Sequence, residues 1–348
     1  MLRSSEPRLV ILTEGYSDPI NAKTATSVLR YGQHPTVAII DSLQVGKTAE
    51  EILGVGGNIP FVANLSDAPT ANTLMIGIAP PGGKIPMSWR SVIRGAIALG
   101  MDVISGLHDF LVDDDDFVID ASRFGVNLID IRKNDEHDVC NQKDIRVECL
   151  RIHTVGQDCS VGKMVASIEV ARALQDQGYD AKFIATGQTG IMIEGDGCPI
   201  DCVVGDFISG AIEKQILAQQ HHEILVIEGQ GSLAHPRYSA VTLGLLHGCI
   251  PHGMILCYEV GRSWVRDMPH VNLKSLQELR TIYENTASIM FPSKIIGVAM
   301  NSRLLSEREA NAERKKVHLE LGLPVCDVLR DGPHDLVKAV QKLHMELR

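Results

Sequence analysis

The sequence predicts an α/β protein composed of two doubly wound domains, each built around a parallel sheet. The length of 348 residues is the first indication, because a domain takes about 150 residues. Short aliphatic runs alternate with amphipathic stretches along the chain, which is typical of parallel strands joined by crossover helices. Hydrophobic residues make up 45% of the chain but aromatic residues only 4%, so the cores must be aliphatic.

The first domain is predicted to span residues 1–145. Its end is placed by the polar stretch 132–144, where the apolar periodicity stops and the charge density rises. The predicted strands are residues 9–13, 36–41, 73–78 and 102–105, and the predicted helices are residues 19–31, 48–53 and 88–99.

Four consecutive aspartates, residues 113–116, form the only low-complexity segment. A cation site is one interpretation of such a run. Consecutive carboxylates cannot all point at one ion unless the loop is specially bent. We therefore predict a solvated turn that caps the next element.

The second domain is predicted to span residues 146–348, where the same alternation starts again. Its predicted strands are residues 147–154, 181–185, 224–228, 254–259, 295–300 and 324–329, and its predicted helices are residues 162–177 and 334–347.

Net charge and composition indicate which kinds of binding partner are unfavourable. The net charge of −10 disfavours nucleic acids and anionic membrane surfaces, which bind basic patches. No run approaches the roughly 18 apolar residues of a membrane-spanning helix, and residues 1–7 lack the apolar run of a signal peptide. Eight scattered cysteines, several of them in apolar runs, suit a reducing compartment. We expect a cytoplasmic protein with a small-molecule substrate, and a homo-oligomer.

A glycine loop between a strand and a helix is the most informative motif. Residues 147–154 form the predicted strand, Gly156 begins the loop, and Gly162 and Lys163 end it at the start of a helix. Backbone N–H groups and the helix dipole there converge on an anion, while the lysine reaches its outer oxygens. The residues predicted to bind phosphate are Gly156, Asp158, Cys159, Ser160, Val161, Gly162, Lys163 and Met164.

The loop departs from the usual phosphate loop in two ways. It is one residue longer, and Met164 stands where serine or threonine would bind Mg²⁺. The longer form resembles the Gly-Thr-Asp-Thr-x-Val-Gly-Lys-Thr loop of dethiobiotin synthetase, an ATP-dependent P-loop enzyme. Residues 228–231 (Glu-Gly-Gln-Gly) resemble its Glu-Gly-Ala-Gly segment, whose acid helps to hold Mg²⁺. That resemblance implies ATP with Mg²⁺ held by Glu228 and, by looser analogy, Asp206.

The same resemblance extends to residues 297–301, which match the segment whose terminal asparagine reads the adenine ring. It implies that Asn301 binds adenine. The nucleotide need not be ATP, because coenzyme A also carries adenine.

Polar residues at the ends of other strands are candidates for the chemistry. Carboxylates at the carboxyl ends of parallel strands point into the crevice where ligands bind, so Glu228 is predicted to be functional. Glu228 or His235 is the expected general base. Arg262 or Arg237 is a candidate for binding substrate carboxylates. The residues expected to face the substrate are Thr186, Gln188, Thr189, Gln230 and Ser232.

A second Gly-Lys-Thr segment, residues 46–48, follows the strand that ends at Asp41. Asp41 occupies the place of the first glycine of a phosphate loop and would repel a phosphate. An acid at that point suits the ribose of a nicotinamide cofactor, but the first strand lacks the G-x-G-x-x-G fingerprint. A structural helix cap at Lys47-Thr48 is the interpretation we favour.

The whole chain resembles a bacterial family associated with D-glutamate N-acetyltransferase. The matching blocks are residues 105–111, 130–133, 155–163, 186–190, 228–232 and 324–327. The resemblance implies a Rossmann-like N-terminal domain, a P-loop NTPase-like C-terminal domain, and acetyl transfer from acetyl-CoA to the amine of D-glutamate or a similar amino acid.

Three function classes follow from these observations. They are an N-acetyltransferase, an ATP- and Mg²⁺-dependent ligase of the dethiobiotin synthetase type, and a nucleotide-binding protein without turnover. Met164 disfavours the ligase, because phosphoryl transfer depends on a positioned Mg²⁺. A coenzyme A transferase needs its phosphates only to be held. The carboxylate-bearing glycine loops disfavour the third class.

Overall fold

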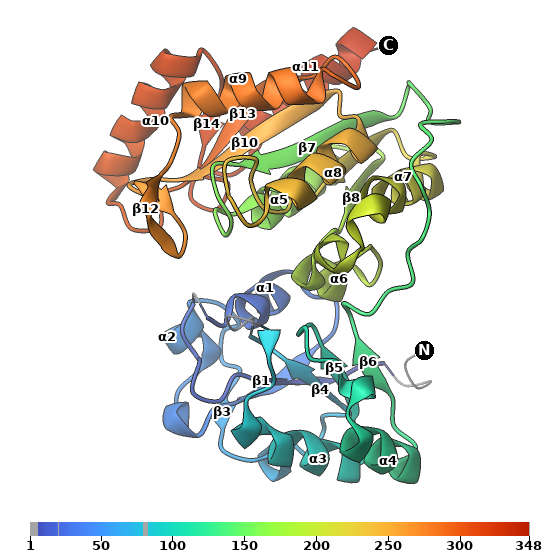
Figure 1. Ribbon diagram of the computed structural model, residues 1–348. Coiled ribbons are helices and arrows are strands. Elements are labelled where there is room, and N and C mark those ends of the chain that lie inside the picture. The colour runs from blue at the N-terminus through green and yellow to red at the C-terminus, as the bar shows by residue number, and fades with distance from the viewer. Residues whose placement is uncertain (1–5, 20, 79–82, 348) are drawn as a thin grey trace. The chain divides into compact units, whose positions relative to one another are not determined.

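The computed structural model describes residues 6–19, 21–78 and 83–347. The chain forms two compact units, one of residues 1–134 with 191–195 and the other of residues 135–190 with 196–348 (Figure 1). The chain start, on which the prediction of no signal peptide rests, and Ile20 of the predicted helix 19–31 lie outside the described residues.

The first unit contains a six-stranded parallel sheet with the order β3-β2-β1-β4-β5-β6. This is a doubly wound order, in which the chain starts at the centre and winds out in both directions. The strands are β1 (Leu9–Leu12), β2 (Thr36–Ile40), β3 (Phe61–Val62), β4 (Thr73–Ile76), β5 (Asp102–Ser105) and β6 (Leu128–Asp130). The helices are α1 (Lys23–Tyr31), α2 (Ala49–Leu53), α3 (Arg90–Ala98) and α4 (Asp115–Phe124).

The first unit confirms the prediction for the acidic run. Asp114 is the N-cap of α4, and its side chain accepts a hydrogen bond from the backbone N–H of Phe117. Its carboxylate also pairs with the guanidinium of Arg90. The carboxylates of the run therefore stabilise the start of a helix, where the helix dipole favours negative charge.

The second unit contains another six-stranded parallel sheet, with the order β14-β13-β10-β7-β9-β8. The strands are β7 (Leu150–Gly156), β8 (Ala181–Ile184), β9 (Ile224–Ile227), β10 (Gly253–Glu259), β13 (Lys294–Asn301) and β14 (Val325–Cys326). A separate antiparallel hairpin pairs β11 (Trp264–Val265) with β12 (Met268–Asn272). The prediction of an α/β protein with two parallel sheets is confirmed.

Helices cover both faces of the second sheet. On one face α5 and α11 pack together, and on the other α7, α8, α9 and α10 bury aliphatic clusters (Figure 1). The helices are α5 (Lys163–Asp176), α7 (Ile208–Gln219), α8 (Ser239–Cys249), α9 (Leu276–Ala287), α10 (Glu307–Leu321) and α11 (His334–Leu347), and α6 (Gln188–Glu194) is divided between the two units. No helix in the described ranges is long and apolar enough to cross a membrane.

The cysteines are free thiols. Five are buried, namely Cys149, Cys198, Cys249, Cys257 and Cys326, and the other three are half-buried. Burial raises the pKa of the buried thiols, to about 12 for Cys249, Cys257 and Cys326.

Candidate functional site

The loops after the central strands of the second sheet lie at one edge, because the strands are parallel. The loop after β7 is central, since β7 lies between β10 and β9. Ligands of open α/β sheets bind at this carboxyl edge. The edge carries the predicted residues of loops 156–164, 186–189 and 228–232, together with Asn301 at the end of β13.

The glycine loop has the backbone of an anion-binding element. β7 ends at Gly156, and α5 begins at Lys163 with Gly162 as its N-cap. The φ angles of Gly162 and Ser160 are 104° and 55°, so the backbone is left-handed at both residues. A residue with a side chain is rarely held in this conformation except where a loop requires it. The turn brings the N–H groups of the loop and of the first turn of α5 toward one point.

Lys163 lies inside this turn. Its side chain is almost completely buried, and its Nζ donates a hydrogen bond of 2.8 Å to the carbonyl oxygen of Asp158. A Cβ added to Gly156 would come within 2.9 Å of the same Nζ. Burial lowers the pKa of Lys163, because the charged form loses its hydration. An anion bound in the loop would therefore stabilise the ammonium.

A tyrosine from α9 holds the glycine loop by hydrogen bonds. The hydroxyl of Tyr283 donates to the carbonyl oxygen of Gly156 at 2.8 Å and accepts from the backbone N–H of Leu233 at 3.1 Å. The hydroxyl of Ser232 donates to the carbonyl oxygen of Gln157 at 3.1 Å. These contacts join the loop after β7 to the loop after β9.

Asp158 is turned into the protein. It is fully buried, and its carboxylate accepts hydrogen bonds from the backbone N–H groups of Cys159 and Arg266 and from Nη1 of Arg262. Arg262 also pairs with Glu259 at the end of β10. Ligand atoms of Asp158, Cys159 and His235 lie within 4.8 Å of one another, but the Arg262 guanidinium already neutralises the aspartate. The cluster is therefore a poor cation site, and Asp158 connects the loop to the hairpin.

Glu228 lies at the end of β9 in a nearly dry position, with only 4% of its surface exposed. One carboxylate oxygen accepts from the backbone N–H groups of Thr186 and Gly187, and the other accepts from Nε2 of Gln230. Burial is the main reason that the pKa of Glu228 rises to about 7. The structure therefore brings three predicted residues, Glu228, Thr186 and Gln230, into one hydrogen-bonded group.

The other predicted residues of this edge differ in exposure. Gln188 and Ser232 are buried, and Thr189 is half-buried. Asn301 is half-buried and lies opposite Glu259 in the register of β13 and β10. Its side-chain oxygen accepts a hydrogen bond from the backbone N–H of Arg303.

His235 is 1% exposed, and its Nδ1 accepts a hydrogen bond of 3.1 Å from the backbone N–H of Arg237. Its Nε2 lies 3.8 Å from a carboxylate oxygen of Asp158. Burial lowers the pKa of His235, which favours the neutral form of the ring. The lone pair that a base would use is occupied in this arrangement.

The arginines predicted for substrate carboxylates are placed differently from that expectation. The guanidinium of Arg262 forms ion pairs with Asp158 and Glu259, so its N–H donors are already used within the protein. Arg237 is exposed, in the short segment between the loop after β9 and α8.

The residues implied for Mg²⁺ lie in different surroundings. Met164 has no hydroxyl, and the Ser167 hydroxyl is buried in hydrogen bonds with the Lys163 carbonyl and the Thr154 hydroxyl. Asp206 is exposed in the turn before α7, and the carboxylate that acts on Glu228 is Asp201. The pairing of Asp206 with Glu228 at a metal ion stays a prediction.

The Gly-Lys-Thr segment of the first unit is structural, as favoured from the sequence. Thr48 is the N-cap of α2 and forms a capping box with Glu51. Lys47 is exposed and donates to the side chain of Gln44. Asp41 is 1% exposed and accepts from the Ser17 hydroxyl and from the backbone N–H of Leu43. Its carboxylate is used within the protein.

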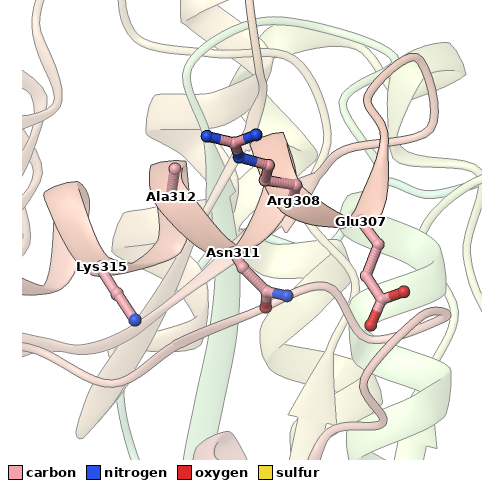
Figure 2. Close-up of a pocket in the computed structure, with 5 residues that line it drawn as sticks. All are labelled: Glu307, Arg308, Asn311, Ala312 and Lys315. Atoms are coloured by element: carbon pink, nitrogen blue, oxygen red, sulfur yellow. The ribbon is translucent and has the colours of Figure 1, made fainter.

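A surface hollow of about 520 Å³ lies along α10 and contains none of the predicted site residues (Figure 2). It is lined by Glu307, Arg308, Asn311, Ala312 and Lys315, all from α10.

Two residues of the site were not predicted from the sequence. Tyr283 stands at helical spacing from Leu279 in α9, so its pattern indicates only a core position. Glu259 ends a buried strand, which is the signal that singled out Glu228, but no glycine motif follows it.

Comparison with known proteins finds one family model in each half of the chain. Residues 42–134 match a family described as a domain of unknown function (DUF1611_N), Rossmann-like domain, and residues 138–337 match its partner (DUF1611_C), P-loop domain. The crystal structure of a DUF1611 family protein from Anabaena variabilis is 35% identical, with a TM-score of 0.91 over 97% of this chain and 100% of that one.

Two curated relatives extend the comparison over most of the chain. Both are named D-glutamate N-acetyltransferase. The protein from Pseudoalteromonas is 37% identical over 77% of this chain and 80% of its own length, and that from Tritonibacter scottomollicae is 40% identical over 82% and 87%. The predicted resemblance and the predicted Rossmann-like and P-loop domains are confirmed, and the chain belongs to the DUF1611 family.

Proposed function

We propose that this protein is an N-acetyltransferase that moves an acetyl group from acetyl-CoA to the amine of D-glutamate or a similar amino acid. The names of the two curated relatives support this reaction. The observation that carries the proposal is a phosphate loop without the hydroxyl that would hold Mg²⁺, since Met164 replaces it and Ser167 is used in the core. Such a loop suits a ligand whose phosphates are held and not cleaved.

The residues of the loop fit the phosphates of the coenzyme. The backbone N–H groups of residues 160–163 and the start of α5 would bind the diphosphate, and Lys163 would neutralise it. The adenine would lie at Asn301, two strands away across β10. The acyl group, once bound, supplies an activated carbonyl to the acceptor.

The acceptor amine must lose a proton before it attacks the thioester carbonyl. A C–N bond then forms, the C–S bond breaks, and the coenzyme leaves as a thiol. We assign Glu228, and not His235, as the base that accepts this proton, because the Nδ1 lone pair of His235 already accepts a hydrogen bond.

The reaction is tested by thiol release from acetyl-CoA in the presence of EDTA. We expect release with D-glutamate and much less without an amino acid, with L-glutamate as the stereochemical control. Phosphate release from ATP that depends on Mg²⁺, without thiol release, would replace the proposal with the ligase. If the protein bound the coenzyme but released no thiol under any condition, it would be a binding protein without turnover.

The role of Glu228 predicts a pH dependence. A base acts in its deprotonated form, and the pKa of Glu228 is raised to about 7, so kcat/KM should rise with pH through about 7. In a Glu228→Gln variant this rise should disappear and kcat should fall by about 10²- to 10⁴-fold. If the variant changed the KM for acetyl-CoA and left kcat alone, Glu228 would act at the phosphates and not as the base.

A further inference from the structure

The loops after β13 and β14 form a second structural element at the carboxyl edge of the sheet that also carries the phosphate loop. Ser302 donates from its backbone N–H and its hydroxyl to one carboxylate oxygen of Asp327, at 2.9 and 2.6 Å. The other oxygen of Asp327 accepts the backbone N–H groups of Leu329 and Arg330. One buried carboxylate therefore fixes both loops at the carboxyl edge of the sheet.

These fixed loops expose two large apolar side chains. Leu304 is 78% exposed and Leu329 is 51% exposed, although both belong to segments with well-defined hydrogen bonds. Asn301, the last residue of β13, lies three residues before Leu304. Its side-chain oxygen accepts a hydrogen bond from the backbone N–H of Arg303, while its amide nitrogen has no hydrogen bond among the described residues. A heteroaromatic base needs apolar contacts on its two faces and a hydrogen bond to a ring or exocyclic atom. Two exposed leucines and an amide N–H donor can supply these contacts.

Arg330 adds a cation that the protein holds in place without neutralising it. Its Nη2 donates to the carbonyl oxygens of Ser302 and Leu305, at 3.2 and 2.8 Å. No ion pair of Arg330 is present in the part of the chain that the structure describes. Arg303, in contrast, is paired with Glu259 at 2.7 Å. A guanidinium oriented by carbonyls and lacking a carboxylate partner is prepared for a phosphate.

The element is continuous with the phosphate loop. A series of ion pairs runs along the edge from Asp158 through Arg262 and Glu259 to Arg303. Three strand spacings separate β7 from β14, about 14 Å in total. One nucleotide can therefore contact the glycine loop through its diphosphate and the loops after β13 and β14 through its base and ribose.

We propose that these two loops bind the 3′-phosphoadenosine part of the coenzyme, with the base between Leu304 and Leu329 and the 3′-phosphate on Arg330. This inference rests on the proposed function, since it takes the ligand of the glycine loop to be a coenzyme A. It identifies the group that distinguishes this coenzyme from ATP, because ATP carries no phosphate on its ribose hydroxyls.

Calorimetric binding of coenzyme A and of 3′-dephospho-coenzyme A tests the proposal at pH 7.5, where the 3′-phosphate is mostly doubly charged. The wild type should prefer coenzyme A by about tenfold or more. An Arg330→Gln variant should bind 3′-dephospho-coenzyme A with wild-type affinity. It should bind coenzyme A only as weakly as that ligand, so the preference is lost. A Leu329→Ser variant should weaken both ligands alike.

Arg308 provides the matched control. It is an exposed arginine of the next helix, in the hollow shown in Figure 2, and it should not contact the coenzyme. An Arg308→Gln variant should bind both ligands as the wild type does. An Arg330→Lys variant, which keeps the charge, should retain part of the preference, and thermal unfolding of each variant shows whether the fold is intact.

Several results would overturn the inference. Equal binding of the two ligands by the wild type would show that the 3′-phosphate is not recognised. Equal weakening of both ligands in Arg330→Gln would give Arg330 a structural role only. In either case the transferase proposal would stand, provided that thiol release occurs. Failure of the wild type to bind either ligand would instead refute the proposed function.

Discussion

Replacing Lys163 with alanine is expected to weaken the binding of coenzyme A at least tenfold. The ammonium lies inside the turn of residues 156–162, where it would contact the phosphates together with the backbone N–H groups. A hydrogen bond to a charged group contributes about 1.5–3 kcal/mol, which corresponds to about 10- to 100-fold in the dissociation constant. Titration calorimetry with coenzyme A measures the change directly.

Lys47 is the matched control for this experiment. It stands in a Gly-Lys-Thr segment of similar sequence, but it is exposed and lies before a capped helix. A Lys47→Ala variant should bind coenzyme A with wild-type affinity. Unchanged affinity in Lys163→Ala would refute the assignment of the loop, and equal losses in both variants would indicate a non-specific effect of positive charge.

A Gly229→Ala substitution is expected to lower the free energy of unfolding of the second unit by about 3 kcal/mol or more. An added Cβ would lie 1.7 Å from the carbonyl oxygen of Thr154 and 3.0 Å from Cδ of Lys163. The first contact is with backbone in the central strand, so no side-chain rotation can relieve it. β7 and β9 would have to separate at the point where the glycine loop begins. Urea unfolding measures the loss of stability.

Gly205 serves as the control, because a Cβ added there meets no atom within 4 Å and its φ is not in the left-handed region. A Gly205→Ala variant should unfold at the same urea concentration as the wild type. A Gly229→Ala variant with wild-type stability and wild-type coenzyme binding would contradict the close approach of the two strand ends.

The elements that carry this fold were largely predictable from local pattern. Buried parallel strands are short aliphatic runs, and β10 was predicted to within one residue of its start, Gly253. The strand predicted at residues 147–154 instead covers Leu150–Gly156, because the chain turns at Arg146 and Cys149 before pairing begins. The two-residue strand β3 has too few residues to show any periodicity.

The parts of the site that consist of contiguous residues could be predicted from the sequence. Gly156 to Lys163 and Glu228 to Ser232 are contiguous motifs, and each does come to the edge of the sheet. Contacts between distant segments could not be predicted. The Asp158 carboxylate reaches a hairpin more than 100 residues further on, and Tyr283 reaches the loop from α9. Only the packing of the helices determines such partners.

The buried thiols also affect how the reaction can be followed. With pKa values of about 12, Cys249, Cys257 and Cys326 are ionised in roughly one molecule in ten thousand at pH 8, and the thiolate is the form that attacks a disulfide dye. These three thiols should therefore contribute little colour while the protein is folded. A burst of colour from them after addition of urea would report unfolding in the same cuvette.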